Sequence, residues 1–354
     1  MEFYVNKNIM KTKRIFPKQN RYNFYRFDMN ENPEGLPKSF VDSVLKEITP
    51  EFLATYPEPD NFVAKYATYM HISENNVLTT NGSDMAIRYV FETFAKESSE
   101  VVTVSPTFGM YDVNCNILGL KHIPVEYEKD LTINVEKILN SINKGVRIVV
   151  LVNPNNPVGN VYSRENVERI IKRAKEVGAI VLIDEAYHYF YPNSLIDVAL
   201  KYQNVIVLRT FSKLFSLAAC RMGIVISNPT IIHYLRNARL TFETNSIALL
   251  FGERILENQG LINNLIESEI TGKKYLVSEL KKENYVYLEC EGNFVLIKPK
   301  YFSPLEIEKV LCLKKRILIH SYESGILKDY FRVSIGSEKM MKLFTDAFFD
   351  VDKK

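Results

Sequence analysis

Lys213 has an unusual position for a lysine, just beyond a run of apolar residues and among small hydroxyl side chains. The run VIVL (205–208) ends at Arg209, and Thr210, Ser212 and Lys213 lie next along the chain. Most lysines are solvated surface charges, so this one has to be judged together with its neighbours. An amine at the mouth of a buried strand can hold a carbonyl carbon as a Schiff base, which is the chemistry of nucleophilic lysines.

Buried strands alternate with helices through the middle of the chain. Apolar runs at 101–106, 147–153, 179–187 and 204–210 are typical of strands covered on both faces. A helix with one apolar stripe fills 164–178, between the second and third of these runs. The pattern predicts an α/β fold with a doubly wound, mostly parallel sheet.

The C-terminal part of the sequence has a different pattern. A helical stretch near 262–283 leads into a hairpin (YVYLEC-EGN-FVLIKP), a helix, the short strands RILIH and YFRVSIG, and a final helix. We therefore expect a large cofactor-binding domain at 46–250 and a smaller α+β domain at 251–354. Residues 1–45 are expected to form an N-terminal arm that belongs in part to the small domain.

Composition excludes several classes of protein. The formal net charge of +3 is too small to indicate a nucleic-acid partner. No apolar run approaches the roughly 20 residues that a membrane span needs, and no signal peptide is recognisable. The four cysteines are far apart and the histidines lack metal-binding spacing, so we expect no metal and reduced thiols. These features predict a cytoplasmic protein.

Polar residues follow three of the strands, at the point where each strand ends. The segments are NPNNPVGN (153–160), DEAY (184–187) and RTFSK (209–213). Ligands of open α/β sheets bind beyond the carboxyl ends of the strands, so these segments should converge on one crevice. The side chains expected there are those of Asn156, Asp184, Tyr187, Thr210, Ser212 and Lys213.

Asp184 and the start of a helix indicate which charges a ligand of this crevice would carry. A buried carboxylate is costly unless a cation or a donor faces it, although Asp184 could instead be an ordinary helix cap. Gly82, Ser83 and Asp84 begin a helix, where free N–H groups suit a phosphate, although Ser and Asp are also common N-caps. An amine, a carboxylate, hydrogen-bond donors and an anion site together describe a site for pyridoxal phosphate (PLP).

The chain resembles the fold-type-I, PLP-dependent aminotransferases of class I and II, and is most similar to the histidinol-phosphate aminotransferases. The resemblance covers most of the chain. Its motifs follow in order: FDMNENPEGLP (27–37), YPEP (56–59), TNGSD (80–84), SPTFGMY (105–111), NPNNPVG (153–159), DEAY (184–187), RTFSKLFSLAACRMG (209–223) and RVSIG (332–336).

The resemblance implies PLP as the cofactor and Lys213, Asp184 and Tyr187 as the catalytic residues. Lys213 would form the Schiff base and later move a proton between the substrate Cα and the cofactor. Asp184 would pair with the ring nitrogen, and Asn156 and Tyr187 would hydrogen-bond the ring hydroxyl.

Other residues would hold the rest of the cofactor. Phe108 would stack on the ring, with Tyr111 as the other candidate. Tyr56 would reach the phosphate of the neighbouring subunit, which implies a homodimer with shared active sites. The residues that would bind the phosphate from the same subunit are Ser83, Asp84, Thr210, Ser212 and Arg221.

The substrate side departs from the family pattern. Arg332 would hold the substrate carboxylate, and Asn30 and Asn32 would border the substrate. The family often has an arginine twelve residues before Arg332, which helps to bind the substrate phosphate, but this chain has His320 there. A histidine is a weaker and pH-dependent anion partner. A small, possibly phosphorylated, amino or oxo substrate is expected, with glutamate as a plausible amino donor.

Three functions compete. An aminotransferase is favoured because Arg332 can hold a carboxylate in the ring plane, which leaves the Cα–H bond perpendicular to the ring. A decarboxylase of a phosphorylated amino acid, similar to threonine-phosphate decarboxylase, could use Arg332 for the phosphate instead. A ligand sensor in a transcription regulator would need a DNA-binding domain for which no segment is left over. A dehydrogenase would need a GxGxxG after a strand, which is absent from the sequence.

Overall fold

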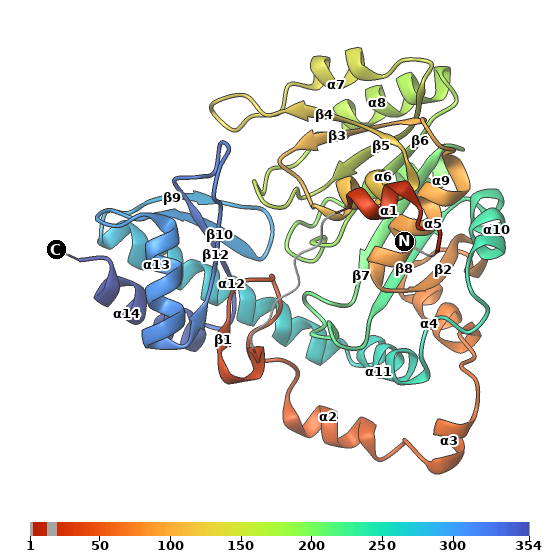
Figure 1. Cartoon of the computed structure of the whole chain (residues 1–354). Coiled ribbons are helices and arrows are strands. Elements are labelled where there is room, and N and C mark those ends of the chain that lie inside the picture. Colours follow the sequence, from red (N-terminus) through yellow and green to blue (C-terminus); the bar gives the residue numbers. More distant parts are fainter. Residues whose placement is uncertain (1–2, 13–19, 354) are drawn as a thin grey trace.

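The computed structural model describes residues 3–12 and 20–353 (Figure 1), and its centre is a seven-stranded sheet. β8 runs antiparallel to both of its neighbours, β2 and β7, and the remaining pairs are parallel. The prediction of a mostly parallel sheet is therefore confirmed. The strands, in order across the sheet, are β2 (Val77–Asn81), β8 (Met222–Ser227), β7 (Val205–Thr210), β6 (Ile180–Asp184), β5 (Val146–Val152), β3 (Glu100–Ser105) and β4 (Lys121–Glu126).

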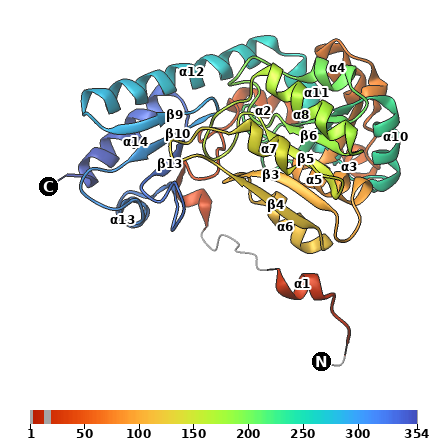
Figure 2. The same cartoon turned by 90° about the horizontal axis from the view of Figure 1, so that it is seen from above.

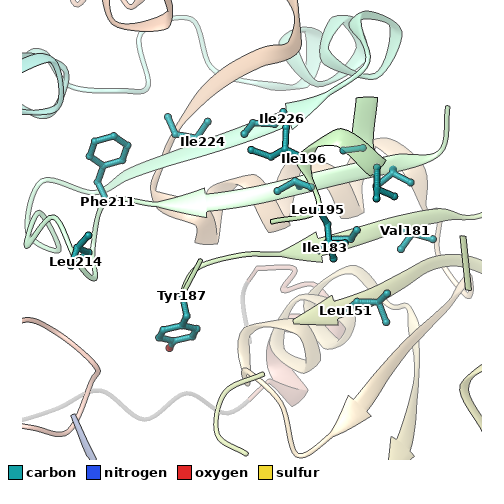
Figure 3. Close-up of a cluster of buried hydrophobic side chains, with 14 of the residues drawn as sticks. Leu151, Val181, Ile183, Tyr187, Leu195, Ile196, Phe211, Leu214, Ile224 and Ile226 are labelled. Carbon is teal, nitrogen blue, oxygen red and sulfur yellow. The ribbon is translucent and has the colours of Figure 1, made fainter. Parts of the chain in front are cut away.

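Helices cover both faces of this sheet, because its strands carry apolar side chains on both sides. On β5, Val149 and Leu151 belong to one core, whereas Ile148 and Val150 belong to the other. Figure 3 shows part of the first core. Its helices are α4 (Asp60–Met70), α7 (Val135–Ser141), α8 (Arg164–Glu176), α9 (Ile196–Lys201) and α11 (Ser246–Leu256). The second core is closed by α5 (Gly82–Phe94), α6 (Met110–Leu118) and α10 (Pro229–Ala238).

A smaller four-stranded sheet lies beside the large one and matches the predicted α+β part. Its strands, in order, are β12 (His320–Ser321), β13 (Phe331–Ser334), β10 (Phe294–Lys298) and β9 (Val286–Glu289). The predicted hairpin is the antiparallel pair β9–β10. The helices of this C-terminal part are α12 (Gln259–Lys282), α13 (Pro304–Val310) and α14 (Glu338–Val351), with the short helix η3 at Leu311–Lys315.

The long helix α12 ties the two parts together (Figure 2). Leu261 and Leu265, in its first half, pack in the core of the large sheet. Leu276 and Leu280, in its second half, pack in the core of the small one. This continuous helix fixes the small sheet beside the carboxyl edge of the large one.

The N-terminal segment reaches the small part through a two-stranded parallel pair. Tyr25 of β1 (Tyr25–Arg26) is in register with Ile317 of β11 (Ile317–Leu318). This confirms that the segment packs beside the small sheet, whereas the domain limits at residues 45 and 250 stay predictions. The other N-terminal elements are α1 (Lys7–Lys11), η1 (Arg21–Asn23), α2 (Lys38–Leu45), α3 (Pro50–Ala54) and η2 (Glu74–Asn76).

Three strands of the large sheet were not predicted. β2 is half polar and β4 is an edge strand with a proline, so neither is a continuous apolar run. β8 is buried along its whole length, but it follows the lysine motif without a helix between them. In addition, the predicted strand RILIH is divided between β11 and β12. No helix among the described residues is long and apolar enough to cross a membrane.

Candidate active site

A cavity of about 560 Å³ lies at the carboxyl ends of the parallel strands and collects most of the predicted site residues. Its wall combines the ends of β6 and β7, the first turn of α5, and β12 and β13 of the small sheet. The predicted residues that line it are Ser83, Asp84, Phe108, Asn156, Asp184, Tyr187, Thr210, Ser212, Lys213, Arg221, His320 and Arg332.

Lys213 enters the cavity from the loop that follows β7. Its Nζ donates a hydrogen bond to the backbone oxygen of Met29 at 2.9 Å and lies 5.9 Å from the ring centre of Tyr187. Burial and, after it, the positive charge of Arg332 lower the pKa of Lys213 to about 8. The amine therefore loses its proton more readily than an ordinary lysine, as a nucleophilic lysine must.

Asp184 is the last residue of β6 and is 3% exposed. Burial raises its pKa to about 6, although two hydrogen bonds oppose the shift. These come from the hydroxyl of Tyr111 at 2.6 Å and from the backbone N–H of Ala186 at 3.0 Å. Both donors are neutral, so the carboxylate is held in place without its charge being cancelled. This arrangement fits a cation, such as a protonated ring nitrogen.

Tyr111 has a different position from the one offered as an alternative stacking residue. It is fully buried beneath Asp184 and lies outside the cavity wall, whereas Phe108 is part of that wall. The two rings meet edge to face, with centroids 6.1 Å apart. Tyr111 therefore supports the carboxylate, and of the two candidates it is Phe108 that faces the cavity.

Another part of the cavity wall combines groups that suit an anion, namely backbone N–H groups and an arginine. Ser83 and Asp84 lie in the first turn of α5, where backbone N–H groups are free. Arg221 Nη2 donates to Asp84 Oδ2 at 2.9 Å, in a partly exposed pair that an anion could compete for. Gly82 leaves room for the guanidinium, because a Cβ there would lie 2.5 Å from Nη2 of Arg221.

Two hydroxyl residues at the end of β7 complete this side. The Thr210 hydroxyl donates to Ser212 Oγ at 3.0 Å and accepts from the Ser212 backbone N–H at 3.1 Å. Both residues line the cavity, so the loop from β7 to Lys213 is held in one conformation by its own side chains.

On the substrate side, Arg332 projects from β13 and is 8% exposed. Its guanidinium donates to the backbone oxygen of Asp28 at 2.6 Å and to Oδ1 of Asn156. His320 is paired with Arg332 across β12 and β13. Removal from water and the positive charge of Arg332 lower the pKa of His320 to about 4, so its ring is neutral at pH 7. In the ligand-free site this histidine therefore does not carry the positive charge that the family's arginine would have there.

Besides Tyr111, three predicted residues lie outside the cavity wall. Asn30 is buried behind Tyr187 and donates to its hydroxyl at 2.9 Å, and Tyr187 itself lies beyond the end of β6 (Figure 3). Asn32 donates to Ser216 Oγ at 2.9 Å, in the loop after Lys213. Tyr56 is 71% exposed and stacks on the ring of Phe242, with centroids 4.4 Å apart. Within one subunit, Tyr56 is therefore not part of the site.

Several lining residues were not predicted. Glu31 lies in the NENP segment and is held by Arg21 at 2.9 Å, a pairing that nothing in the local sequence indicates. Met29 presents its backbone oxygen to Lys213, which no side-chain pattern could reveal. Thr107 belongs to the SPTFGMY motif and could have been included. Tyr322 comes from a short segment without periodicity.

The residues of the cavity fit PLP. A lysine of lowered pKa, a buried carboxylate with neutral donors, and a helix N-terminus beside an arginine lie around one space. A family model for aminotransferase class I and II matches residues 23–348. The chain therefore belongs to the class I and II aminotransferases and is a PLP-dependent enzyme of this kind.

Among its relatives are several histidinol-phosphate aminotransferases. The chain is 34% identical to that of Clostridium novyi (strain NT), over 89% of this chain and 88% of the relative. It is 31% identical to that of Methanocaldococcus jannaschii, over 89% and 86% of the two chains. The crystal structure of histidinol-phosphate aminotransferase from Sinorhizobium meliloti in complex with pyridoxal-5'-phosphate has a TM-score of 0.87 and 20% identity, covering 98% of this chain and 97% of that one. This structure shares the fold, which is that of the fold-type-I enzymes.

The lowered pKa of Lys213 should be visible in the stability of the cofactor-free protein. Between pH 8 and 10.5 the unfolded chain still binds the lysine proton that the folded chain has released. The free energy of unfolding of the wild type, relative to Lys213→Met, should therefore rise through this window. Urea unfolding across it measures the difference. The exposed Lys144→Met variant, which removes a lysine away from the cavity, is the control, and the pH dependence measured with Lys213→Met should exceed that measured with it. A Lys213→Met difference that is flat or falls with pH would contradict the assignment.

Proposed function

We propose that this enzyme transfers an amino group between an amino-acid donor, with glutamate as the first candidate, and a small substrate of the histidinol-phosphate type. The observation that carries the proposal is the Arg332 guanidinium, which lines the same cavity as Lys213 and can hold one anionic group of the substrate beside the reacting amine. The names of the relatives support the choice of substrate.

In this proposal the chain's own residues carry and direct protons. PLP, when bound, supplies an aldehyde and a ring that draws electrons from the substrate Cα. Asp184 keeps a proton on the ring nitrogen, which makes that ring electron-poor. Lys213 would hold the aldehyde carbon of PLP, and its amine would move a proton at the substrate Cα. Tyr187, oriented by Asn30, donates a hydrogen bond to the ring hydroxyl, together with Asn156.

The remaining roles concern binding. Phe108 would stack on the ring, and Arg221, which now donates to Asp84, would instead hold the cofactor phosphate. The first turn of α5, with the hydroxyls of Thr210 and Ser212, supplies neutral donors to the same phosphate. His320, being neutral, leaves Arg332 as the cation that selects the substrate anion.

Transamination is favoured over decarboxylation by the position of Arg332. It is anchored by Asp28 and Asn156 and is only 8% exposed, so it can fix a carboxylate in one orientation. A carboxylate fixed in the ring plane leaves the Cα–H bond free to break. The relatives are named as aminotransferases, in agreement with this choice.

A substrate panel tests the proposed function. The purified holoenzyme is mixed with glutamate, histidinol phosphate and phosphorylated amino acids, while the cofactor absorbance and carbon dioxide release are followed. Loss of the PLP absorbance with glutamate and with histidinol phosphate, without carbon dioxide, is expected. Arg332→Ala should lower kcat/KM about 10- to 100-fold, the scale of hydrogen bonds to a charged group, and leave bound PLP in place. Carbon dioxide release from a phosphorylated amino acid would establish the decarboxylase instead.

We also propose that the enzyme is a cytoplasmic homodimer with shared active sites. Large apolar side chains gather around Tyr56, and exposed apolar surface of this kind marks a protein contact. Those of Leu53, Tyr56, Leu240 and Phe242 are each more than half exposed. If a second subunit covered these side chains, Tyr56 of one subunit would lie near the cavity of the other. The free cysteines agree with a reducing compartment.

Complementation between two impaired variants tests the shared site. In a hybrid dimer of Lys213→Ala and Tyr56→Ala subunits, one site is built from an intact Lys213 and an intact Tyr56. Mixing the subunits should therefore restore up to about a quarter of the wild-type activity per subunit. Lys213→Ala mixed with Asp184→Asn is the control and should give no rescue, because both residues come from the same subunit. A verified hybrid of the first kind without activity would contradict the shared site.

A further inference from the structure

A fully buried ion pair joins the ends of β6 and β7. Arg209 Nη2 and Nε lie 2.9 and 3.1 Å from Oε2 of Glu185, and the two side chains are 3% and 1% exposed. Neither residue lines the cavity. Each is a direct chain neighbour of a cavity residue, since Glu185 follows Asp184 and Arg209 precedes Thr210.

The pair lies on the face of the sheet opposite Asp184. On β7, Val205 and Val207 alternate with Ile206 and Leu208 and pack in the first core, so Arg209 projects to that same side. Asp184 instead bonds to Tyr111, which packs in the second core. The two strand ends are therefore fixed on one face by charge while they present their cavity groups on the other.

Glu185 also fixes the loop that carries Tyr187. Its Oε1 accepts from the backbone N–H of Leu195 at 2.6 Å, and its Oε2 accepts from the Ser194 hydroxyl at 3.0 Å. Arg209 Nη2 donates to the same Ser194 hydroxyl at 2.8 Å. The Glu185 carboxylate thus joins the start of the loop between β6 and α9 to its end, and Tyr187 belongs to the segment between them.

Stability alone does not explain such a pair. Removing two charges from water is costly, and apolar residues of similar size often replace a buried ion pair without loss of stability. An ion pair, unlike apolar contacts, demands one geometry, because both oxygens and the guanidinium must meet their partners.

We propose that Arg209 and Glu185 are positioning residues, which set the distance between the strand ends that carry Asp184 and the Thr210–Lys213 loop. The proposal rests on the assignment to the PLP-dependent aminotransferases and not on the proposed substrate. Its readouts concern the bound cofactor, so a wrong substrate would leave them unaffected.

The test compares an apolar replacement with the wild type. The double variant Arg209→Met/Glu185→Leu should fold in the cofactor-free form, with a thermal midpoint lowered only by the loss of the acceptor for Ser194 and Leu195. Its affinity for PLP should fall about tenfold, and the pH at which the absorbance of bound PLP changes should shift. With any substrate that the wild type accepts, kcat should fall about tenfold at nearly constant KM. Arg209→Lys keeps the charge but loses the two-point contact. Its PLP affinity and its kcat should therefore lie between those of the wild type and those of the double variant.

A matched control uses the exposed ion pair between Arg164 and Asp197, which lie 2.6 Å apart and away from the cavity. Arg164→Met/Asp197→Leu should leave PLP affinity and absorbance unchanged. A folded Arg209→Met/Glu185→Leu variant with wild-type PLP affinity, absorbance profile and kcat would overturn the proposal. A double variant that does not fold would overturn it as well, because the pair would then be needed for the fold itself.

Discussion

The burial of the Asp184 carboxylate is the constraint around which the site is built. A charge at the end of a buried strand is unfavourable unless something compensates it. Here the Tyr111 hydroxyl and a backbone N–H hold the group without neutralising it, and its pKa remains raised, to about 6. In the proposed role of Asp184, a cationic ring nitrogen beside the carboxylate would offset the free-energy cost of its burial. The same logic applies with opposite sign to Lys213, whose amine is held by a carbonyl oxygen and has a lowered pKa.

The architecture makes this possible because the sheet is rigid on both faces. Apolar side chains on the two sides of β6 and β7 lock the strands, and the last residue of each strand then projects into the cavity with little freedom. The small sheet contributes Arg332 from the opposite side, and α12 joins both cores. The groups proposed for the cofactor and the group proposed for the substrate therefore come from separate layers of one continuous structure.

Much of this was accessible from the sequence, because its signals are local. Apolar runs ending in polar segments located β6, β7 and their cavity residues, and the motif order gave the cofactor and the family. Contacts between distant segments were not accessible. The roles of Tyr111 beneath Asp184 and of Asn30 behind Tyr187 depend on how the layers meet. The strands β2, β4 and β8 lacked a distinct apolar run of their own between helices, and Tyr56 lies outside the cavity that holds Lys213.

The central claim is that Lys213 is the amine that binds PLP, and its chemical capture is the most direct test. The holoenzyme is reduced with borohydride, digested, and its peptides are analysed by mass spectrometry. The account predicts one phosphopyridoxyl label, on the peptide that contains Lys213, and no label in the Lys213→Ala protein. A label on another lysine, or an unlabelled protein that nevertheless holds PLP and turns over substrate, would contradict it.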